Sequence, residues 1–272
     1  CIVPYTRGKE RSRLMDDIIE EVKGLKADGY QEITLLGQNV NSYGKDLEED
    51  YDFATLLEEV AKTGIARIRF TTSHPWDFSR EMIEIINQYD NIMPYIHLPV
   101  QSGNTEILKL MGRRYTREQY LELFHMIKEV MPDCSITTDI IVGFPGETEE
   151  EFEKTYQFLK EIKLYKMHVF QYSPRKGTRA AVMPNQVDGN VKEKRSRKLI
   201  ELSNENQKRY NEMLVGKEVE VLFEDQAVEE DKKYFKGHTQ NYIFVKYETD
   251  ENLENTLKSV KIKSADVEHV NA

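Results

Sequence analysis

The feature that most constrains this chain is a regular alternation of short apolar runs with longer amphipathic stretches between residues 13 and 170. The short runs are rich in branched and aromatic residues and mostly apolar on both faces, as parallel strands covered by helices are. We expect strands at residues 33–36, 68–71, 95–100, 136–142 and 167–172. The runs recur at about the 30-residue length of a βα repeat. The pattern predicts an α/β fold, a partial βα barrel similar to a TIM barrel.

Two predicted helices have clear start signals. Thr116 and Gln119 form a capping-box pair, and Thr148 and Glu151 form another. Apolar residues recur at helical spacing after each pair, and we expect most of them to serve only as core.

The texture of the sequence changes in the last third of the chain. Residues 189–212 are basic and helical in pattern, with Leu199 and Leu202 as their few apolar contacts, so we expect a helical connector there. In residues 213–272 apolar residues alternate with charged ones, and this period of two predicts a small all-β barrel. The preceding βα unit would occupy residues 1–188.

Composition excludes several classes of protein. The 272 residues are 39% hydrophobic, which is enough for a core and argues against disorder despite a net charge of -10. No apolar run approaches the roughly 20 residues of a membrane span, and no signal peptide is visible, so we expect a cytoplasmic protein. Two cysteines, Cys1 and Cys134, are too few for a disulfide scaffold. Because the chain begins with Cys1 rather than Met, we expect a fragment whose upstream part is missing.

Each predicted strand runs directly into a polar loop. These loops are residues 37–39, 72–75, 101–103, 143–147 and 173–178. In a βα barrel the carboxyl ends of the strands form the face where ligands and chemistry lie. Polar loops gathered on one rim argue for an enzyme.

The first residues carry the most specific motif. Residues 1–13 read Cys-Ile-Val-Pro-Tyr-Thr-Arg-Gly-Lys-Glu-Arg-Ser-Arg, which resembles the segment beginning at the third cysteine of the CxxxCxxC loop in radical S-adenosylmethionine (SAM) enzymes of the methylthiotransferase family. The resemblance implies that Cys1 is a catalytic residue and a metal ligand, holding a [4Fe-4S] cluster that binds SAM. Three thiolates on such a loop leave the fourth iron free for SAM. The first barrel strand and most of the cluster loop would lie upstream.

Further segments are similar to the same family. They are residues 35–44, 69–75, 98–103, 111–116 and 141–148. The cofactor-binding residues that the resemblance implies are Gly37, Gln38, Asn39, Ser73, Gln101, Ser102, Arg114, Gly143, Gly146 and Glu147. Family precedent places residues 37–39 at the methionine amino group, an arginine such as Arg114 at its carboxylate, and residues 143–147 at the adenine. The last loop also reads as a strand-to-helix turn capped at Thr148, and both interpretations stand because they use different atoms.

The C-terminal module resembles a TRAM domain, which this family uses to hold tRNA. The module is acidic overall, opposite to the usual footprint of a nucleic-acid binder. Locally, Lys232, Lys233 and Lys236 interleave with aromatic residues and would offer phosphate contacts beside stacking surfaces. An ordinary solvated hairpin is the alternative. The basic connector, with Arg195 and Arg197, gives the more persuasive positive surface for RNA.

The resemblance divides between two branches of the family. The first half is similar to MiaB-type enzymes, which methylthiolate isopentenyladenosine beside the anticodon. Residues 166–178 and 237–242 look more like MtaB-type enzymes, which modify threonylcarbamoyladenosine at the same tRNA position. We favour the MiaB branch, because residues 37–44 lie on the expected active rim.

The family resemblance also implies the remaining components. A second [4Fe-4S] cluster, held by three cysteines of a missing N-terminal domain, would donate sulfur. The partners would be a tRNA anticodon stem-loop and an electron donor such as flavodoxin or ferredoxin. We expect the isolated chain to lack methylthiolation activity, and we expect Cys134 to be a core residue.

Two hypotheses from other classes remain at this point. One is an ordinary metabolic βα-barrel enzyme without iron, and the other is an RNA-binding protein whose barrel is catalytically inactive. Upstream sequence separates them: CxxxCxx before Cys1 would support radical chemistry, and three earlier cysteines would support sulfur insertion. The sequence does not determine the oligomeric state.

Overall fold

Parallel strands form the framework of the first unit, in a computed structural model that describes residues 3, 6, 8–49, 51–229 and 232–272. The strands are β1 (Glu32–Leu36), β2 (Arg67–Thr71), β3 (Tyr95–His97), β4 (Ser135–Val142) and β5 (Lys166–Gln171). β1 pairs with β2, and β3, β4 and β5 pair in that order. An isolated bridge between Ile68 and Ile92 connects the two ladders. The described strands therefore form an open parallel arrangement, which confirms the predicted α/β fold with a partial barrel.

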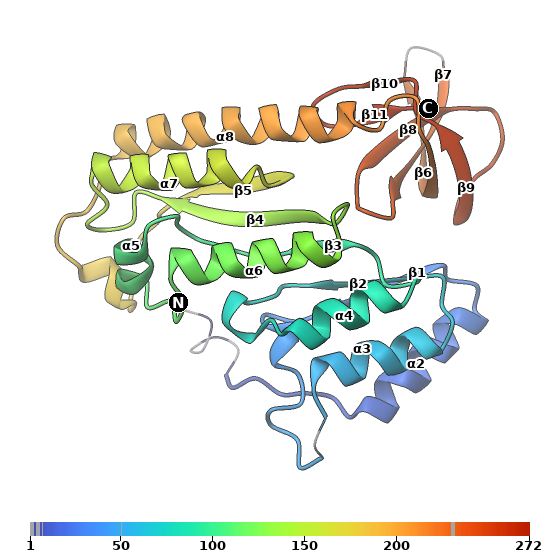
Figure 1. Ribbon diagram of the computed structural model, residues 1–272, viewed down its shortest axis with the longest axis horizontal. Helices are drawn as coiled ribbons and strands as arrows, with labels where there is room; N and C mark the ends of the chain where they lie inside the picture. Colours follow the sequence, from blue (N-terminus) through green and yellow to red (C-terminus); the bar gives the residue numbers. More distant parts are fainter. Residues whose placement is uncertain (1–2, 4–5, 7, 50, 230–231) are drawn as a thin grey trace.

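Helices cover one face of these strands (Figure 1). They are α2 (Met15–Ala27), α3 (Phe53–Lys62), α4 (Arg80–Gln88), α5 (Thr105–Leu110), α6 (Arg117–Val130), α7 (Glu149–Ile162) and α8 (Gly189–Glu212), with short 3-10 turns η1 (Val40–Ser42), η2 (Pro75–Asp77) and η3 (Arg179–Val182). Both predicted capping boxes are confirmed, at Thr116 before α6 and at Thr148 before α7.

The two faces of the parallel strands differ in cover. Ile68 and Phe70 point toward the helices and are fully buried. We call the opposite side the open face; it carries Thr34, Leu36, His97, Asp139, His168 and Phe170 at alternate strand positions. Leu36 is 78% exposed and Phe170 is 53% exposed. The open face is therefore accessible in the described structure.

β3 ends earlier than the predicted run of residues 95–100. Pro99 has no N–H, and the Val100 N–H donates to the Thr138 hydroxyl at 2.8 Å instead of to the backbone of β4. Pairing resumes at Gln101, which has a φ of 65° and whose N–H donates to the Asp139 carbonyl at 2.9 Å. The ladder is thus interrupted just below the loops.

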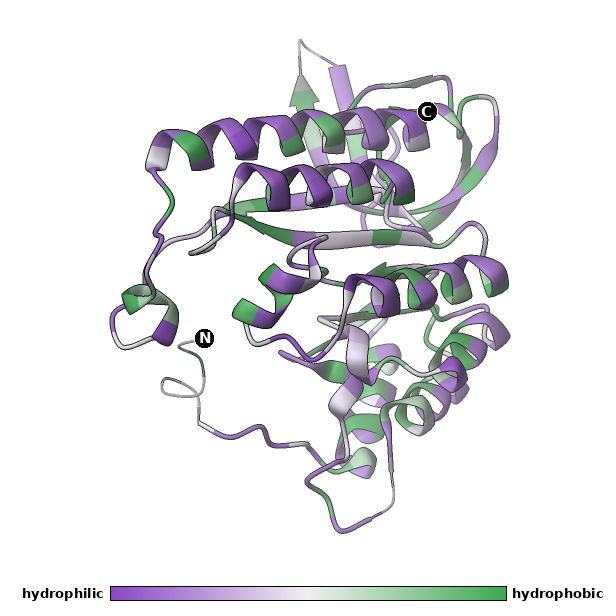
Figure 2. Ribbon diagram, turned by 60° about the vertical axis from the view of Figure 1, so that its left-hand side comes forward, coloured by the Kyte–Doolittle hydropathy of each residue, from purple (hydrophilic) through white to green (hydrophobic). Residues whose placement is uncertain are grey.

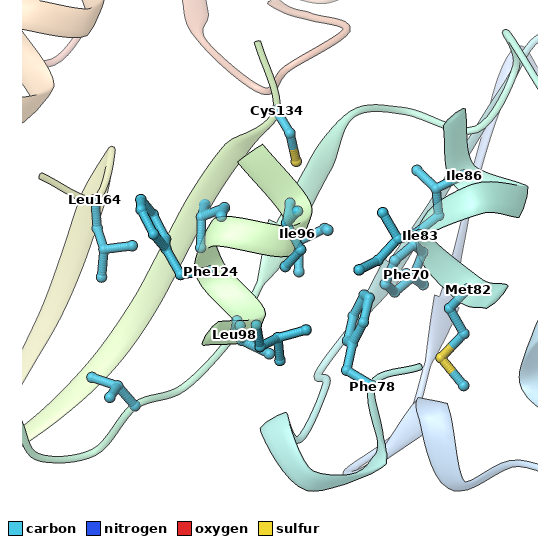
Figure 3. Packing of buried hydrophobic residues seen from close by; sticks show 14 of the residues in the cluster. Phe70, Phe78, Met82, Ile83, Ile86, Ile96, Leu98, Phe124, Cys134 and Leu164 are labelled. Carbon is cyan, nitrogen blue, oxygen red and sulfur yellow. The ribbon is translucent and has the colours of Figure 1, made fainter. Parts of the chain in front are cut away.

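An apolar cluster fills the space between strands and helices (Figure 3). Phe70, Ile83, Ile96 and Phe124 belong to it. Cys134 is a free thiol inside the same cluster, and burial raises its pKa to about 12. Because Cys134 is fully buried, the prediction that it is a core residue is confirmed.

The second unit consists of β6 (Glu218–Glu229), β7 (Lys232–Thr239), β8 (Phe244–Glu248), β9 (Thr256–Lys261), β10 (Ser264–Ala265) and β11 (Val270–Asn271). The strand order is β10-β11-β8-β7-β6-β9. Val221, Phe223 and Val260 point into a separate apolar core, which confirms the predicted period of two. No pairing joins the two edge strands β9 and β10 among the described residues, so these strands form an open sheet and not the closed barrel that the sequence predicts.

Helix α8 packs along the first unit. Leu199 and Leu202 are buried, and the Ser203 hydroxyl accepts a hydrogen bond from the Met167 N–H of β5 at 2.9 Å. The helix is otherwise largely hydrophilic (Figure 2). Among the described helices, none is both long and apolar enough to cross a membrane.

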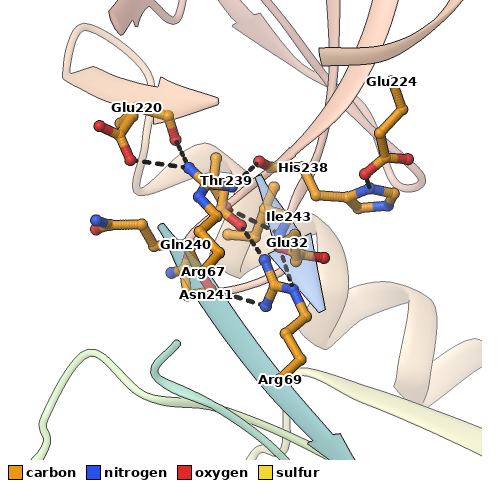
Figure 4. A network of polar contacts seen from close by, with 10 residues as sticks. All are labelled: Glu32, Arg67, Arg69, Glu220, Glu224, His238, Thr239, Gln240, Asn241 and Ile243. Carbon is orange, nitrogen blue, oxygen red and sulfur yellow. Dashed lines mark hydrogen bonds and ion pairs between the residues drawn. The ribbon is translucent and has the colours of Figure 1, made fainter. Parts of the chain in front are cut away.

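Two buried arginines of β2 hold the second unit against the amino ends of the parallel strands (Figure 4). Arg67 donates to the carbonyl oxygens of His238 at 2.9 Å and Glu220 at 3.2 Å. Arg69 donates to the Thr239 carbonyl at 2.9 Å and pairs with Glu32 at 2.9 Å. Because these contacts lie at the start of β2, the second unit and the polar loops lie at opposite ends of the strands (Figure 1).

Candidate functional site

The loops that follow β1, β2 and β3 are joined by backbone hydrogen bonds at the carboxyl ends of the strands. The Gly37 N–H donates to the Thr71 carbonyl, and the Val40 N–H donates to the Thr72 carbonyl, both at 3.0 Å. The Ser73 N–H donates to the His97 carbonyl at 3.3 Å. The predicted cofactor residues Gly37 and Ser73 therefore lie on adjoining loops. We call this set of loops the rim.

Asn39 is fixed on the rim with its amide nitrogen turned inward. That nitrogen donates to Asp77 at 2.8 Å and to the Ser42 hydroxyl at 2.5 Å. Burial alone would raise the pKa of Asp77, but hydrogen bonds from Lys45, Ser42 and Asn39 together hold it below its ordinary value. Because the ionised carboxylate must accept, the amide orientation follows from the network. The Asn39 side-chain oxygen is left without a partner among the described residues.

A second orphaned oxygen lies on the neighbouring loop. Ser73 is fully buried, and its hydroxyl also lacks a hydrogen-bond partner within the described part of the chain. Buried polar atoms are rarely left unpaired in native proteins, and those that are commonly face a ligand, ion or water. The Asn39 oxygen and the Ser73 hydroxyl thus suit a ligand with an amino group, such as the methionine end of SAM. These residues fit the cofactor that the sequence predicts.

Gln101 and Ser102 follow the interruption of β3 and are both buried. Gln101 adopts its left-handed conformation at the interruption of β3, close to the rim. The Ser102 hydroxyl instead lies 3.2 Å from the Thr155 hydroxyl of α7 and accepts from the Asn104 N–H. Ser102 therefore fixes the loop to α7, and its side chain is directed into the core.

The loop at residues 143–147 is tightly packed against α8. Gly143 has a φ of 70°, and a Cβ atom there would come within 2.1 Å of the Lys192 side chain. The Gly143 N–H donates to the Glu147 carboxylate at 2.8 Å. Burial raises the pKa of Glu147, while the Gly143 N–H and Arg195 oppose that rise. Glu147 therefore shapes the loop from inside, and Gly146 continues it with a φ of 92° and an N–H donated to Asn185.

Arg195, which the sequence predicts to bind RNA, is buried in the structure. Its side chain is 5% exposed and pairs with Glu147 at 2.8 Å and Glu149 at 3.2 Å. A guanidinium enclosed by two carboxylates is not available to a phosphate, so the prediction that Arg195 contacts RNA is wrong. Arg197, on the same helix, is exposed and forms an ion pair with Glu193.

The other predicted contacts lie at the two ends of the molecule. Gln38 and Arg114 are exposed. Lys232, which pairs with Glu248 at 3.0 Å, lies on the same side of β7 as Lys236, while Lys233 lies on the other. These lysines therefore belong to two surfaces of the second unit.

A polar group on the open face was not predicted from the sequence. The His97 Nδ1 lies 2.9 Å from the Thr137 hydroxyl, which is also 3.0 Å from the Tyr95 hydroxyl. The His97 Nε2 lies 3.5 Å from Asp139. His168 lies alongside, its ring centroid 5.8 Å from that of His97. The sequence does contain a signal for this group, because its polar residues recur at every second position of β4 and β5.

The predicted cluster ligand Cys1 lies outside the described residues. Within the described part of the chain, no group of three His, Cys, Asp or Glu side chains is placed to hold a metal ion. The fit to SAM therefore depends on the rim, and the iron ligand stays a prediction.

Comparison with known proteins identifies the family. The radical SAM superfamily model matches residues 1–159. Proteins named tRNA-2-methylthio-N(6)-dimethylallyladenosine synthase are similar to this chain: that of Acetivibrio thermocellus is 50% identical over 97% of this chain and 55% of its own length. That of Bacillus subtilis is 48% identical over 97% of this chain and 52% of its own length. The chain thus spans about half the length of the curated relatives it matches.

A solved structure supports the same assignment at the level of fold. Coproporphyrinogen III oxidase (HemN) from Escherichia coli, a radical SAM enzyme, aligns with a TM-score of 0.53 at 16% identity. The alignment covers 71% of this chain and 45% of that one. Since the family model covers more than half of the sequence, and the open parallel strands agree with it, the chain belongs to the radical SAM superfamily.

Proposed function

We propose that this chain carries the SAM-binding and RNA-binding parts of a tRNA methylthiotransferase that modifies N6-dimethylallyladenosine (isopentenyladenosine) next to the anticodon. One observation carries the proposal: about half of the residues, over 97% of the chain, are identical to those of proteins named for this reaction. The rim supports it, because its buried acceptors suit an amino-group ligand.

The chain's own contribution is to bind and orient SAM. Asn39 and Ser73 would accept hydrogen bonds from the cofactor, Gln101 and Arg114 would complete its methionine side, and the loop at residues 143–147 would lie at its adenine. SAM bound to a reduced [4Fe-4S] cluster supplies one-electron chemistry that no side chain can provide. The protein positions the reacting groups and keeps water away from them.

The remaining components extend beyond this chain. Cys1 would be one of three thiolates holding the SAM-binding cluster, and a second [4Fe-4S] cluster would be held by residues outside the 272. The RNA partner would be a tRNA anticodon stem-loop, and a flavodoxin or ferredoxin would donate electrons. We place the reaction in the cytoplasm, and we expect the isolated chain to be inactive.

Threonylcarbamoyladenosine is the second candidate substrate, because residues 166–178 and 237–242 resemble the MtaB branch. The open face favours the dimethylallyl group. Phe170 and Leu36 expose apolar surface there, which suits an uncharged alkyl substituent better than a carboxylate-bearing one.

Mass spectrometry of tRNA nucleosides tests the proposal. Deletion of the full-length gene is expected to abolish methylthiolated isopentenyladenosine and leave its precursor, and the wild-type gene is expected to restore the modification. Complementation with the Cys1→Ala gene is expected to fail, which tests the cluster ligand separately. Loss of methylthio groups from threonylcarbamoyladenosine would assign the other branch. Unchanged nucleosides in the deletion strain would refute both.

A further inference from the structure

The open face combines polar and apolar side chains in a fixed order along β4 and β5. Asp139 lies opposite His168, and Ile141 lies opposite Phe170 one step nearer the rim. Side chains two positions apart in a strand share a face, so His168 and Phe170 stand next to each other. Phe170 keeps 53% of its surface exposed. A half-exposed ring thus adjoins a carboxylate and an imidazole.

The polar members are held in place by neighbours. The Thr137 hydroxyl fixes His97 Nδ1 at 2.9 Å, and His97 Nε2 approaches Asp139 at 3.5 Å. Burial, followed by the nearby His97, lowers the pKa of His168. A neutral imidazole both donates and accepts a hydrogen bond, and a carboxylate only accepts. The group therefore offers mixed hydrogen-bonding capacity with little freedom to move.

The site has limits at both ends. On the rim side, the Ser73 N–H donates to the His97 carbonyl, so Ser73 is a neighbour of His97. Its hydroxyl has no partner among the described residues. On the other side, the ring of Tyr95 meets that of Tyr242, from the second unit, at a centroid distance of 4.7 Å. The Arg69 guanidinium lies 4.7 Å from the centroid of the Tyr242 ring and stabilises this pair of tyrosines. A ligand on the open face would lie between the cofactor acceptors and the two tyrosines.

Shape and charge restrict what this site would bind. An exposed ring beside Ile141 suits a flat or apolar group, because aromatic stacking and apolar burial both favour such a contact. Asp139 and His168 suit a ring edge with N–H and nitrogen groups, as flipped bases are read in other enzymes. The Asp139 carboxylate disfavours an anionic substituent. Lys166 is on the same face of β5 but lies opposite Thr137, farther from the rim and nearer Tyr95 and Tyr242.

We propose that the open face between β4 and β5 binds an adenine base that carries an apolar N6 substituent, with Phe170 and Ile141 packing against the base and its alkyl group and with Asp139 and His168 bonded to the ring edge. The proposal rests on the proposed function, since the base would be part of the RNA substrate. It makes Phe170 and Asp139 the residues that select the substrate.

Binding of short RNA hairpins tests this selection. We would measure the affinity of the full-length protein with reconstituted clusters by fluorescence anisotropy for one hairpin in three forms, with unmodified adenosine, dimethylallyladenosine or threonylcarbamoyladenosine in the loop. Wild-type protein is expected to prefer the dimethylallyl form roughly tenfold over the unmodified form. Phe170→Ala is expected to weaken binding of all three hairpins, because the ring packs against the base, and to reduce the preference for the dimethylallyl form toward unity, because the contact with the alkyl group is also lost. Asp139→Asn is expected to weaken discrimination against the threonylcarbamoyl form.

The outcomes separate this inference from the function it rests on. Tyr30→Ala removes a 56% exposed ring at the turn before β1 and is expected to leave all three affinities unchanged. Equal binding of the three hairpins by wild-type protein, or a preference that survives Phe170→Ala, would overturn the inference and leave the proposed reaction standing. Failure of wild-type protein to bind any hairpin would contradict the proposed RNA substrate itself. Circular dichroism of each variant confirms that it is folded.

Discussion

The two faces of the parallel strands are built from the same backbone but have different chemistry. On the helix side, Ile68 and Phe70 are fully buried and pack into a continuous apolar cluster. On the open face, His97 and Asp139 form a polar group while Phe170 stays half-exposed. Apolar burial on one side supplies stability, which lets the other side keep polar and exposed groups. Successive residues of a strand therefore alternate between packing into the core and facing the open side.

A matched pair of phenylalanines tests this difference and has the largest expected effect. Phe70→Ala is expected to lower the free energy of unfolding by about 4 kcal/mol, because it leaves a cavity next to Phe53. Phe170→Ala is expected to change it by less than about 0.5 kcal/mol, since the ring is half-exposed. Urea unfolding followed by circular dichroism measures both values. Similar losses in the two variants would show that the faces do not differ in the way described.

Two arginines on α8, one buried and one exposed, extend the comparison to the pH dependence of stability. Arg195→Met is expected to cost about 3 kcal/mol of unfolding free energy at pH 8, because it leaves the buried Glu147 carboxylate without its cation. Burial raises the pKa of Glu147 in the folded state, so that state takes up a proton more readily than the unfolded chain. Stability therefore rises as the pH falls through that pKa, and the loss in Arg195→Met should shrink toward pH 5.

Arg197→Met is the control for that experiment. Arg197 is exposed on the same helix, and its removal is expected to change stability by less than about 0.5 kcal/mol at either pH. Urea unfolding of both variants at pH 8 and pH 5 provides the measurement. If the loss of stability in Arg195→Met does not depend on pH, the unpaired Glu147 carboxylate is not its cause.

The smallest expected effect concerns the rim. Ser73→Ala removes a buried hydroxyl that has no partner among the described residues, so the stability of the chain is expected to stay unchanged or to rise slightly. The affinity for SAM is expected to fall roughly 2- to 10-fold, because one hydrogen bond to the ligand is lost. Equilibrium dialysis of SAM against the full-length protein with reconstituted clusters measures this change. Unaltered affinity would remove Ser73 from the cofactor site.

Much of the fold could be predicted because it depends on neighbours in sequence. The caps at Thr116 and Thr148 satisfy N–H groups three residues away, and the alternation in β6 reflects a single buried face. The length of β3 was overestimated, because the effect of Pro99 on the ladder depends on where Thr138 lies on another strand.

The site was harder to predict, because side-chain direction depends on distant partners. Arg195 looks like a surface residue of a basic helix until Glu147, 48 residues earlier, is placed beside it. The polar group around His97 and Asp139 was not predicted, because the strands were expected to be covered by helices and apolar on both faces. The contact of Arg69 with Thr239 joins residues 170 apart, which no local pattern reveals. The predicted SAM contacts on the rim stay predictions.

The position of Arg67 has a consequence for how the chain is made. Its guanidinium, 1% exposed, is bonded to the carbonyl oxygens of Glu220 and His238, which leave the ribosome more than a hundred residues after β2. Until then the Arg67 guanidinium lacks these acceptors, so β2 reaches its final packing only after residues 220 and 238 have been made. A chain that ended before residue 213 would leave the buried Arg67 guanidinium without the carbonyl oxygens that accept its hydrogen bonds, so the first unit depends on the second for the packing of β2.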